Sequence, residues 1–127
     1  MTEAGASFRF PREERLKERN EIRDVFARRR SVSCSGAKVF MLKNGLEHNR
    51  IAFTFSRKFG NAVQRNRCRR LSREVYRLLR HELAKGYDIV LLVYPGRDVF
   101  SVRMEQMREL FSRAGLMSAY RGKQESA

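Results

Sequence analysis

The chain has 127 residues, with 28 lysines and arginines against 14 aspartates and glutamates, and its formal net charge is +14 at pH 7. With 42% hydrophobic residues it is long enough for one folded domain with one core. The excess of positive charge indicates a polyanionic partner, most often nucleic acid. No apolar run approaches the ~18 residues of a membrane span, and no secretory signal is visible, so we expect a cytoplasmic protein without a membrane partner.

The first half of the chain predicts one helix followed by strands. Asn20 can cap a helix over residues 21–28, in which three apolar residues share one face. The strand segments that follow are 32–35, which is weak, and then 38–43 and 50–56. The turn signal Asn44-Gly45 predicts that the last two strands pair as an antiparallel hairpin.

The second half predicts two helices around a buried strand. A long helix starts at Ala62 and ends near Lys85-Gly86. A continuous apolar run over 87–94 predicts a central strand, and a last helix is expected over about 101–114. The order is α-β-β-α-β-α, which predicts an α/β (α+β) two-layer sandwich. We expect one domain over residues 11–116, a flexible arm at 1–10 and a flexible tail at 117–127.

The long helix has two opposite faces. Its apolar stripe follows spacings of three and four and consists of Cys68, Leu71, Val75, Leu78 and Leu79. Its other face is nearly all arginine, and between Arg57 and Arg80 there are nine basic residues with Glu74 as the one acid. Each like-charge pair four residues apart costs about 0.2–0.5 kcal/mol, so this face is expected to bind an anion. A merely solvated basic face is the alternative.

Groups that could perform catalysis are not gathered in the sequence. His48 lies in a polar loop and His81 late in the basic helix, and both are predicted to be surface residues. The carboxylates are scattered, and no glycine-rich phosphate loop is present. The two cysteines, Cys34 and Cys68, stand far apart without a neighbouring histidine, so neither a disulfide nor a zinc site is expected. We therefore predict no catalytic residue and no metal ligand on this chain.

The segment 56–70 resembles the signature of the bacterial ribonuclease P protein family. That family carries an R-N-R-x-K-R core after an S-K-K-x-G-x-A-V-x lead, and here the core begins at Arg65-Asn66-Arg67. Arg57 and Arg69 stand where lysine is commoner, and both keep the charge. The resemblance covers about residues 10–115. It implies a fold like the second domain of ribosomal protein S5, with a left-handed β-α-β crossover around the basic helix.

The resemblance also implies the function. The family's protein is the subunit of ribonuclease P that binds the catalytic RNA, one protein with one RNA, and the 5′ leader of precursor tRNA. It supports endonucleolytic removal of the leader to give the mature tRNA 5′ end, and it broadens the substrate range. The catalytic groups and the required Mg²⁺ belong to the RNA subunit, the protein alone holds no cofactor, and DNA is not a partner.

Site residues follow from the same resemblance. Contacts to the catalytic RNA are implied for Arg57, Lys58, Asn61, Arg65, Asn66, Arg67, Arg69, Arg70, Arg73 and Arg77. Leader contacts are implied for Ile22, Phe26 and Phe40, although core packing is an open alternative for all three. A structural RNA-binding protein of ribosomal type is the alternative function, since it would also be small, basic and α/β.

Overall fold

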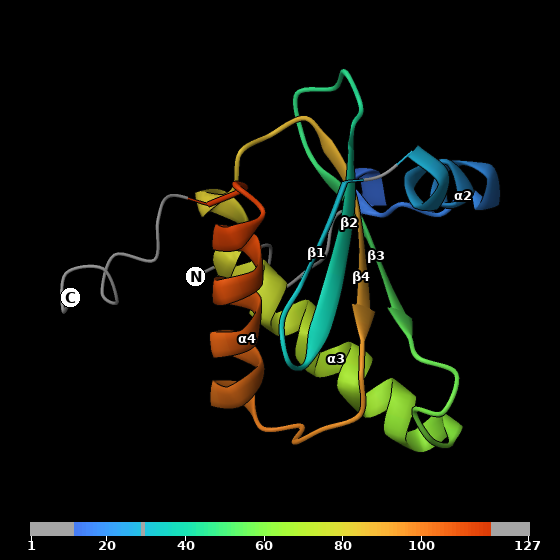
Figure 1. Cartoon of the computed structure of the whole chain (residues 1–127), viewed down its shortest axis with the longest axis vertical. Coiled ribbons are helices and arrows are strands. Elements are labelled where there is room, and N and C mark those ends of the chain that lie inside the picture. The colour runs from blue at the N-terminus through green and yellow to red at the C-terminus, as the bar shows by residue number, and fades with distance from the viewer. Residues whose placement is uncertain (1–11, 29, 118–127) are drawn as a thin grey trace, which may run out of the picture.

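A four-stranded sheet forms the centre of the protein, in a computed structural model that describes residues 12–28 and 30–117 (Figure 1). The strands are β1 (Arg30–Ser33), β2 (Ala37–Lys43), β3 (Arg50–Phe55) and β4 (Tyr87–Val93). Their order across the sheet is β1-β2-β4-β3. β2 pairs antiparallel with both β1 and β4, whereas β3 pairs parallel with β4. The predicted flexible segments 1–10 and 117–127 lie outside the described residues, except for Met117, which forms a β-bridge with Leu83.

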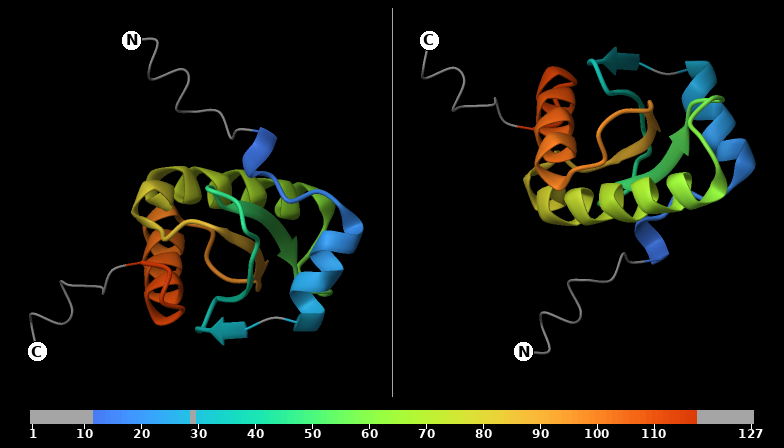
Figure 2. Two further views of the ribbon diagram at one scale, coloured as in Figure 1. Left: turned by 90° about the horizontal axis from the view of Figure 1, so that it is seen from above. Right: turned by 90° about the horizontal axis from the view of Figure 1, so that it is seen from below.

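Helices cover both faces of this sheet. They are α2 (Arg19–Arg28), which follows the short 3₁₀ helix η1 (Arg12–Glu14), then α3 (Ala62–Leu79), continued by the 3₁₀ helix η2 (Arg80–Glu82), and α4 (Phe100–Arg113). The two views of Figure 2 place α3 and α4 against one face and α2 against the other. The predicted α/β sandwich is therefore confirmed, and α2 adds a partial cover on the second face.

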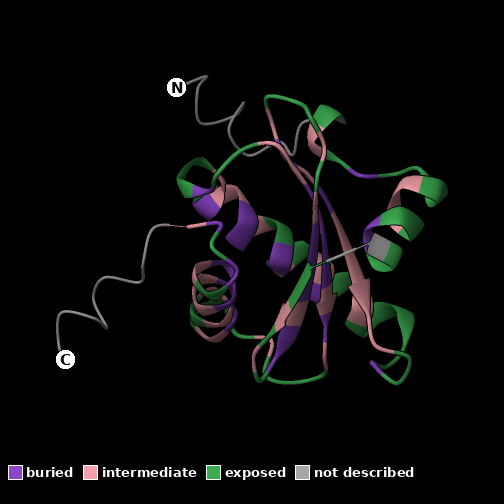
Figure 3. Cartoon of the chain, turned by 45° about the horizontal axis from the view of Figure 1, so that its top comes forward, coloured by how far each residue is buried: buried purple, intermediate pink, exposed green. Residues whose placement is uncertain are grey.

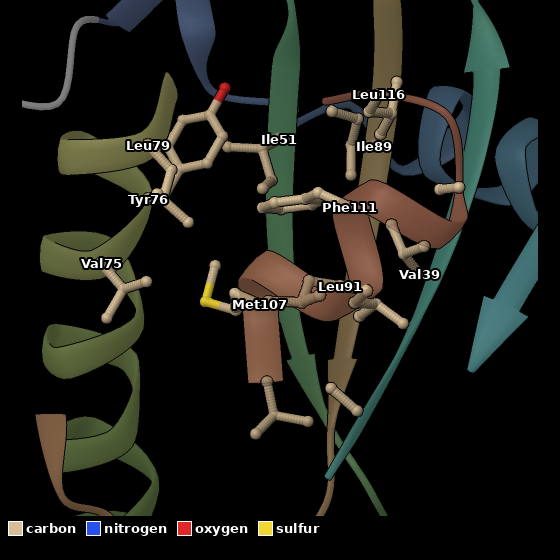
Figure 4. Close-up of a cluster of buried hydrophobic side chains, with 14 of the residues drawn as sticks. Val39, Ile51, Val75, Tyr76, Leu79, Ile89, Leu91, Met107, Phe111 and Leu116 are labelled. Atoms are coloured by element: carbon tan, nitrogen blue, oxygen red, sulfur yellow. The ribbon is translucent and has the colours of Figure 1, made fainter. Parts of the chain in front are cut away.

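The main core lies between the sheet and the layer of α3 and α4. Alternate strand residues point into it, and α3 and α4 contribute the facing stripes, as Figure 4 shows. Its members include Val39, Ile51, Ile89, Leu91, Val75, Tyr76, Leu79, Met107 and Phe111. Each such side chain contributes about 1.5–3 kcal/mol when it is fully buried. In Figure 3 the buried residues concentrate on the strands and on the inner sides of these helices.

A smaller core lies under α2. It consists of Leu16, Val25, Phe40 and Val90, with Ile22, Leu42, Ala52 and Leu92 partly buried around it. Because α2 is short, much of this second sheet face stays half-buried.

The predicted hairpin between the second and third strands is wrong. β4 lies between β2 and β3, because α3 carries the chain back across the sheet and places β4 parallel to β3. The turn signal itself is real, since the Leu46 N–H donates to Asn44 Oδ1 at 2.7 Å. The loop after β2 carries the chain past the position of β4, so β3 does not lie next to β2 in the sheet.

The element boundaries also differ from those predicted. The weak segment at 32–35 is a separate strand, β1, so three strands precede the long helix instead of two. α2 begins at Arg19, so Asn20 lies inside its first turn and is not its cap. α3 ends at Leu79, short of the predicted end near Lys85, because η2 turns the chain and Leu83 is buried. The β3-α3-β4 connection is the predicted crossover, and its hand stays a prediction.

Candidate nucleic-acid interface

The basic helix α3 begins with a reciprocal cap. The Gln64 N–H donates to Asn61 Oδ1 at 2.9 Å, and the Asn61 N–H donates to Gln64 Oε1 at 2.9 Å. This capping box satisfies two backbone donors that a helix start leaves open. Asn61, predicted to contact RNA, therefore has a structural role at the N-cap.

Gly60 sits immediately before this cap in a conformation that only glycine adopts readily. Its φ is +138°, and an added Cβ would lie 2.1 Å from Gln64 Oε1. Arg65 Nη1 donates to the Gly60 carbonyl, so the same short turn also positions the first arginine of the helix. The glycine thus ties the loop from β3 to the start of the arginine face.

The buried face of α3 is rotated slightly from the predicted stripe. The residues it buries are Cys68, Ser72, Val75, Tyr76 and Leu79. Three of these were predicted, while Leu78 was expected inside and is 38% exposed. Tyr76 replaces it in the core and packs edge-on to Phe53, with ring centroids 6.3 Å apart. The opposite face keeps its predicted arginines.

The predicted basic contacts differ in exposure and in the contacts that they make. Arg67 and Arg70 are exposed. Arg69 is held, since its Nη1 donates to Asn66 Oδ1 at 2.8 Å and its guanidinium lies 5.0 Å from the Phe55 ring centroid. Arg57 and Lys58 are exposed in the loop before the helix.

Arg77 is paired with an acidic residue of its own helix. It forms an ion pair with Glu74, and that hydrogen bond is the main cause that raises the pKa of Arg77 and lowers the pKa of Glu74. The last turn of α3 is consequently less free to bind a phosphate than the first three turns.

A hollow lies on the surface of α3, beside its second and third turns. It has a volume of about 280 Å³ and is lined by Asn66, Arg69, Arg70 and Arg73. Burial, followed by the charges of Arg15 and Arg69, lowers the pKa of Arg73 from its ordinary value. Partly desolvated like charges repel one another, and this electrostatic arrangement favours the binding of an anion.

The residues predicted to touch the leader lie together on the opposite side of the sheet. Phe26 from α2 packs edge-on to Phe40 from β2, with ring centroids 4.7 Å apart. Phe26 is 36% exposed, whereas Phe40 is 6% exposed and belongs to the smaller core. Ile22 packs against the same core. Phe26 therefore offers more ring surface to a ligand than Phe40 does. Phe40 fits the alternative of core packing best.

Sequence reasoning missed two neighbours of these sites. Lys38 Nζ lies 5.2 Å from the centroid of the Phe40 ring, which places an ammonium beside the Phe26–Phe40 pair. Phe55 supports Arg69, as described above. The alternation along each strand could have identified Lys38, because it shares a face with Phe40. Nothing in the sequence indicates that Phe55 meets a side chain of the helix.

The histidines take different positions from one another. His81 is exposed, as predicted, while His48 is half-buried with its Nε2 3.0 Å from the Glu13 carbonyl oxygen. Both line a cavity of about 200 Å³ with Arg80 and Glu14, which form an ion pair at 2.8 Å. Within residues 12–28 and 30–117, no three histidine, cysteine or acidic side chains gather as metal ligands. In the same part of the chain, no helix combines the length and apolar character needed to cross a membrane.

Comparisons with known proteins agree with this picture. The family profile described as "Ribonuclease P" matches residues 10–115. The ribonuclease P protein component of Dictyoglomus thermophilum is 33% identical, over 81% of this chain and 86% of the relative. The ribonuclease P protein structure from Thermotoga maritima superposes with a TM-score of 0.70 at 30% identity, covering 79% of this chain and 96% of that one. A Staphylococcus aureus ribonuclease P protein, at 21% identity and a TM-score of 0.74, supports the fold alone.

The fold and the arginine face define a small, basic α/β protein of the RNA-binding class. The chain belongs to the ribonuclease P protein family. Its function is that of the protein subunit of this tRNA-processing endoribonuclease, and the ribosomal-type alternative is not favoured.

Proposed function

We propose that α3 docks this protein onto the RNA subunit of ribonuclease P, one protein with one RNA. The observation that carries the proposal is the one-signed outer face of α3, where Glu74 is the one acidic residue between Arg57 and Arg80. Guanidinium groups suit structured RNA because its phosphates and 2′-hydroxyls are the accessible features. The phosphate contacts assigned to this face are those of Arg57, Lys58, Arg65, Arg67, Arg69, Arg70 and Arg73.

The 5′ leader of precursor tRNA is assigned to the other side of the sheet. There Phe26 exposes an aromatic ring and Lys38 supplies a charge beside it. A single strand binds to such a combination through base stacking and phosphate attraction. Ile22 borders this region without a ring of its own, and Phe40 supports Phe26 from below. The two faces let one small protein hold the catalytic RNA and the substrate at once.

In this proposal the chemistry belongs to the RNA. The RNA subunit binds Mg²⁺ and hydrolyses the phosphodiester, and the protein lowers the repulsion between two polyanions and retains the leader. The assembly works in the cytoplasm, removes the leader to give the mature 5′ end and accepts a broader range of precursors than the RNA alone.

Reconstitution tests the division of labour. Purified protein, the RNA subunit and their mixture are each incubated with a precursor tRNA and Mg²⁺, and the 5′ end of the product is mapped. At moderate Mg²⁺ the mixture is expected to cleave at the mature 5′ end faster than the RNA alone, and the protein alone is expected to be inactive. Cleavage at that position by RNA-free protein would refute the assignment of the chemistry to RNA.

The salt dependence of binding tests the interface. Each phosphate neutralised contributes about 0.7–0.9 to the slope of log K against log salt. Changing Arg65, Arg67 and Arg69 together to alanine should therefore lower that slope by about two to three. A matched variant that removes three charges elsewhere, at Lys43, Arg97 and Arg113, should change it much less. Equal slopes for the two triple variants would mean that α3 does not form the interface with the RNA.

A further inference from the structure

The hollow on α3 is lined by three arginines, whose guanidiniums can donate hydrogen bonds to an anion, and by one asparagine. Its volume is about 280 Å³, and the described residues that line it are Asn66, Arg69, Arg70 and Arg73. None of these four residues is acidic, and Glu74, the next acid along the helix, pairs with Arg77. Three guanidiniums thus border a space large enough for a phosphate group, and the Asn66 amide lies beside them.

Arg69 is held in place on two sides. Its Nη1 donates to Asn66 Oδ1 at 2.8 Å, and its guanidinium lies 5.0 Å from the centroid of the Phe55 ring. Phe55 is itself supported, since its ring packs edge-on to the buried Phe59 with centroids 5.0 Å apart. A guanidinium fixed in this way loses less conformational freedom when its remaining N–H groups bind a ligand.

The charges around the hollow favour an occupant of opposite sign. Arg69 and Arg73 are four residues apart on the helix, and such like-charge pairs destabilise it. Burial lowers the pKa of Arg73 most, and the charge of Arg15, from the segment before α2, followed by that of Arg69, lowers it further. A phosphate placed among these groups would replace repulsion by attraction and accept hydrogen bonds from several of them.

We propose that Phe55 and Asn66 position Arg69, so that its guanidinium meets one phosphodiester of the RNA partner at a discrete place in this hollow. The inference rests on the proposed RNA-binding role of α3 and adds two positioning residues to the arginines already assigned to the RNA. Asn66 acts here through Arg69, whereas the sequence predicts that it touches the RNA itself. Phe55 acquires a role that the sequence does not predict.

A double-mutant cycle tests the positioning role, with the affinity for the ribonuclease P RNA subunit as the readout at fixed salt. Phe55→Leu should weaken binding about two- to fivefold, the scale of one exposed cation–π contact, and should have no further effect in an Arg69→Ala background. Phe55→Tyr keeps the ring and should keep the affinity. Phe53→Leu is the matched control on the same strand, because that ring packs against Tyr76 instead, and it should bind RNA normally.

The cycle also has a result that overturns the inference. If Phe55→Leu costs the same factor with and without Arg69, the ring acts through the fold and not through the guanidinium. If Phe55→Leu does not fold, Asn66→Ala at its exposed helix position completes the same cycle with Arg69→Ala. A loss that persists in the Arg69→Ala background would then mean that Asn66 contacts RNA directly, against the proposal.

The phosphate site is tested separately in the free protein. Inorganic phosphate is titrated while the arginine Nε–Hε signals are followed by NMR. The signals of Arg69, Arg70 and Arg73 should shift together along one saturation curve, with the exposed Arg97 and Arg113 as controls. Equal shifts at all arginines would mean general screening and overturn the site.

The outcomes separate this inference from the function on which it rests. If the intact protein fails to bind the RNA subunit at all, the proposed function fails. If it binds and the salt slope depends on α3, but the cycle is additive or the phosphate shifts are uniform, only the discrete site fails.

Discussion

Arg50 and Asp88 face each other across the parallel strands β3 and β4 and bind fork to fork, through Nε–Oδ1 at 2.8 Å and Nη2–Oδ2 at 2.7 Å. Asp88 is 6% exposed, and its hydrogen bond is the main cause that raises the pKa of Arg50. Arg50 Nη1 also reaches Glu21 on α2 at 3.2 Å. One guanidinium thus joins the sheet to the helix that carries Phe26.

Removing the buried partner of Arg50 should be costly. Asp88→Asn leaves the guanidinium with only the more exposed Glu21 as a charged acceptor and should lower the free energy of unfolding by about 2–4 kcal/mol in urea titrations. Glu21→Gln breaks the more exposed half of the network and should cost less than about 1 kcal/mol. Equal losses for the two variants would mean that burial does not set the strength of this network.

Gly60 should resist substitution more strongly than another glycine with positive φ. Gly60→Ala meets both an unfavourable φ and the Gln64 side chain, whereas Gly45→Ala, at φ +75°, has no atom within 4 Å of its new Cβ. We expect about 1 kcal/mol for the backbone effect alone at Gly45 and a larger loss at Gly60, measured by thermal unfolding. Equal losses would show that Gln64 moves aside without breaking the capping box.

The two phenylalanines near the leader face should separate binding from stability. Phe26→Ala removes an exposed ring. It should weaken the holoenzyme's binding of precursor tRNA by about 1–3 kcal/mol and change the free energy of unfolding only slightly. Phe40→Ala empties a core position and should cost about 3–5 kcal/mol of stability. Binding of a precursor without a leader is the control, because neither substitution should alter it in a folded protein. Unchanged leader binding in Phe26→Ala would refute the leader assignment.

Alkaline pH should destabilise the fold through a buried thiol. Burial, followed by the nearby Asp98, raises the pKa of Cys68 from 9.0 to about 11. The unfolded chain then loses this proton at a lower pH than the folded chain, so the free energy of unfolding falls between about pH 9 and 11. The slope from this thiol is at most about 1.4 kcal/mol per pH unit. Cys68→Ala should flatten the slope of denaturant midpoints against pH, and an unchanged slope would exclude this thiol as its cause.

The sequence predicts the secondary-structure elements of this protein better than it predicts which side chains from different elements pack together. Periodicity located α3, because its apolar residues and its arginines repeat with the helical turn. The same periodicity cannot distinguish Leu78 from Tyr76 as the residue that enters the core, since both lie near the edge of the stripe. That choice depends on Phe53, which is distant in sequence and close in space.

Strand pairing was the part that local signals could not supply. Asn44-Gly45 reads as a hairpin turn, yet the strand that separates β2 from β3 comes from residues 87–93, more than thirty positions later. In the candidate site, the charge pattern predicts which face would bind an anion, and this stays a prediction. The contacts of Arg69 with Phe55 and of Phe40 with Phe26 link different elements, so only the fold reveals which side chains are free to bind.

The place of β4 has a consequence for how the protein is made. During synthesis the whole arginine face leaves the ribosome before Tyr87, and at that stage β3 still lacks the strand it pairs with in the described fold. Because β4 is the strand that joins β3 to the β1–β2 pair, the four-stranded sheet cannot be completed before β4 has been synthesised. A strongly basic segment is therefore synthesised next to the ribosome's own RNA before β4 and α4, which share its core, are available.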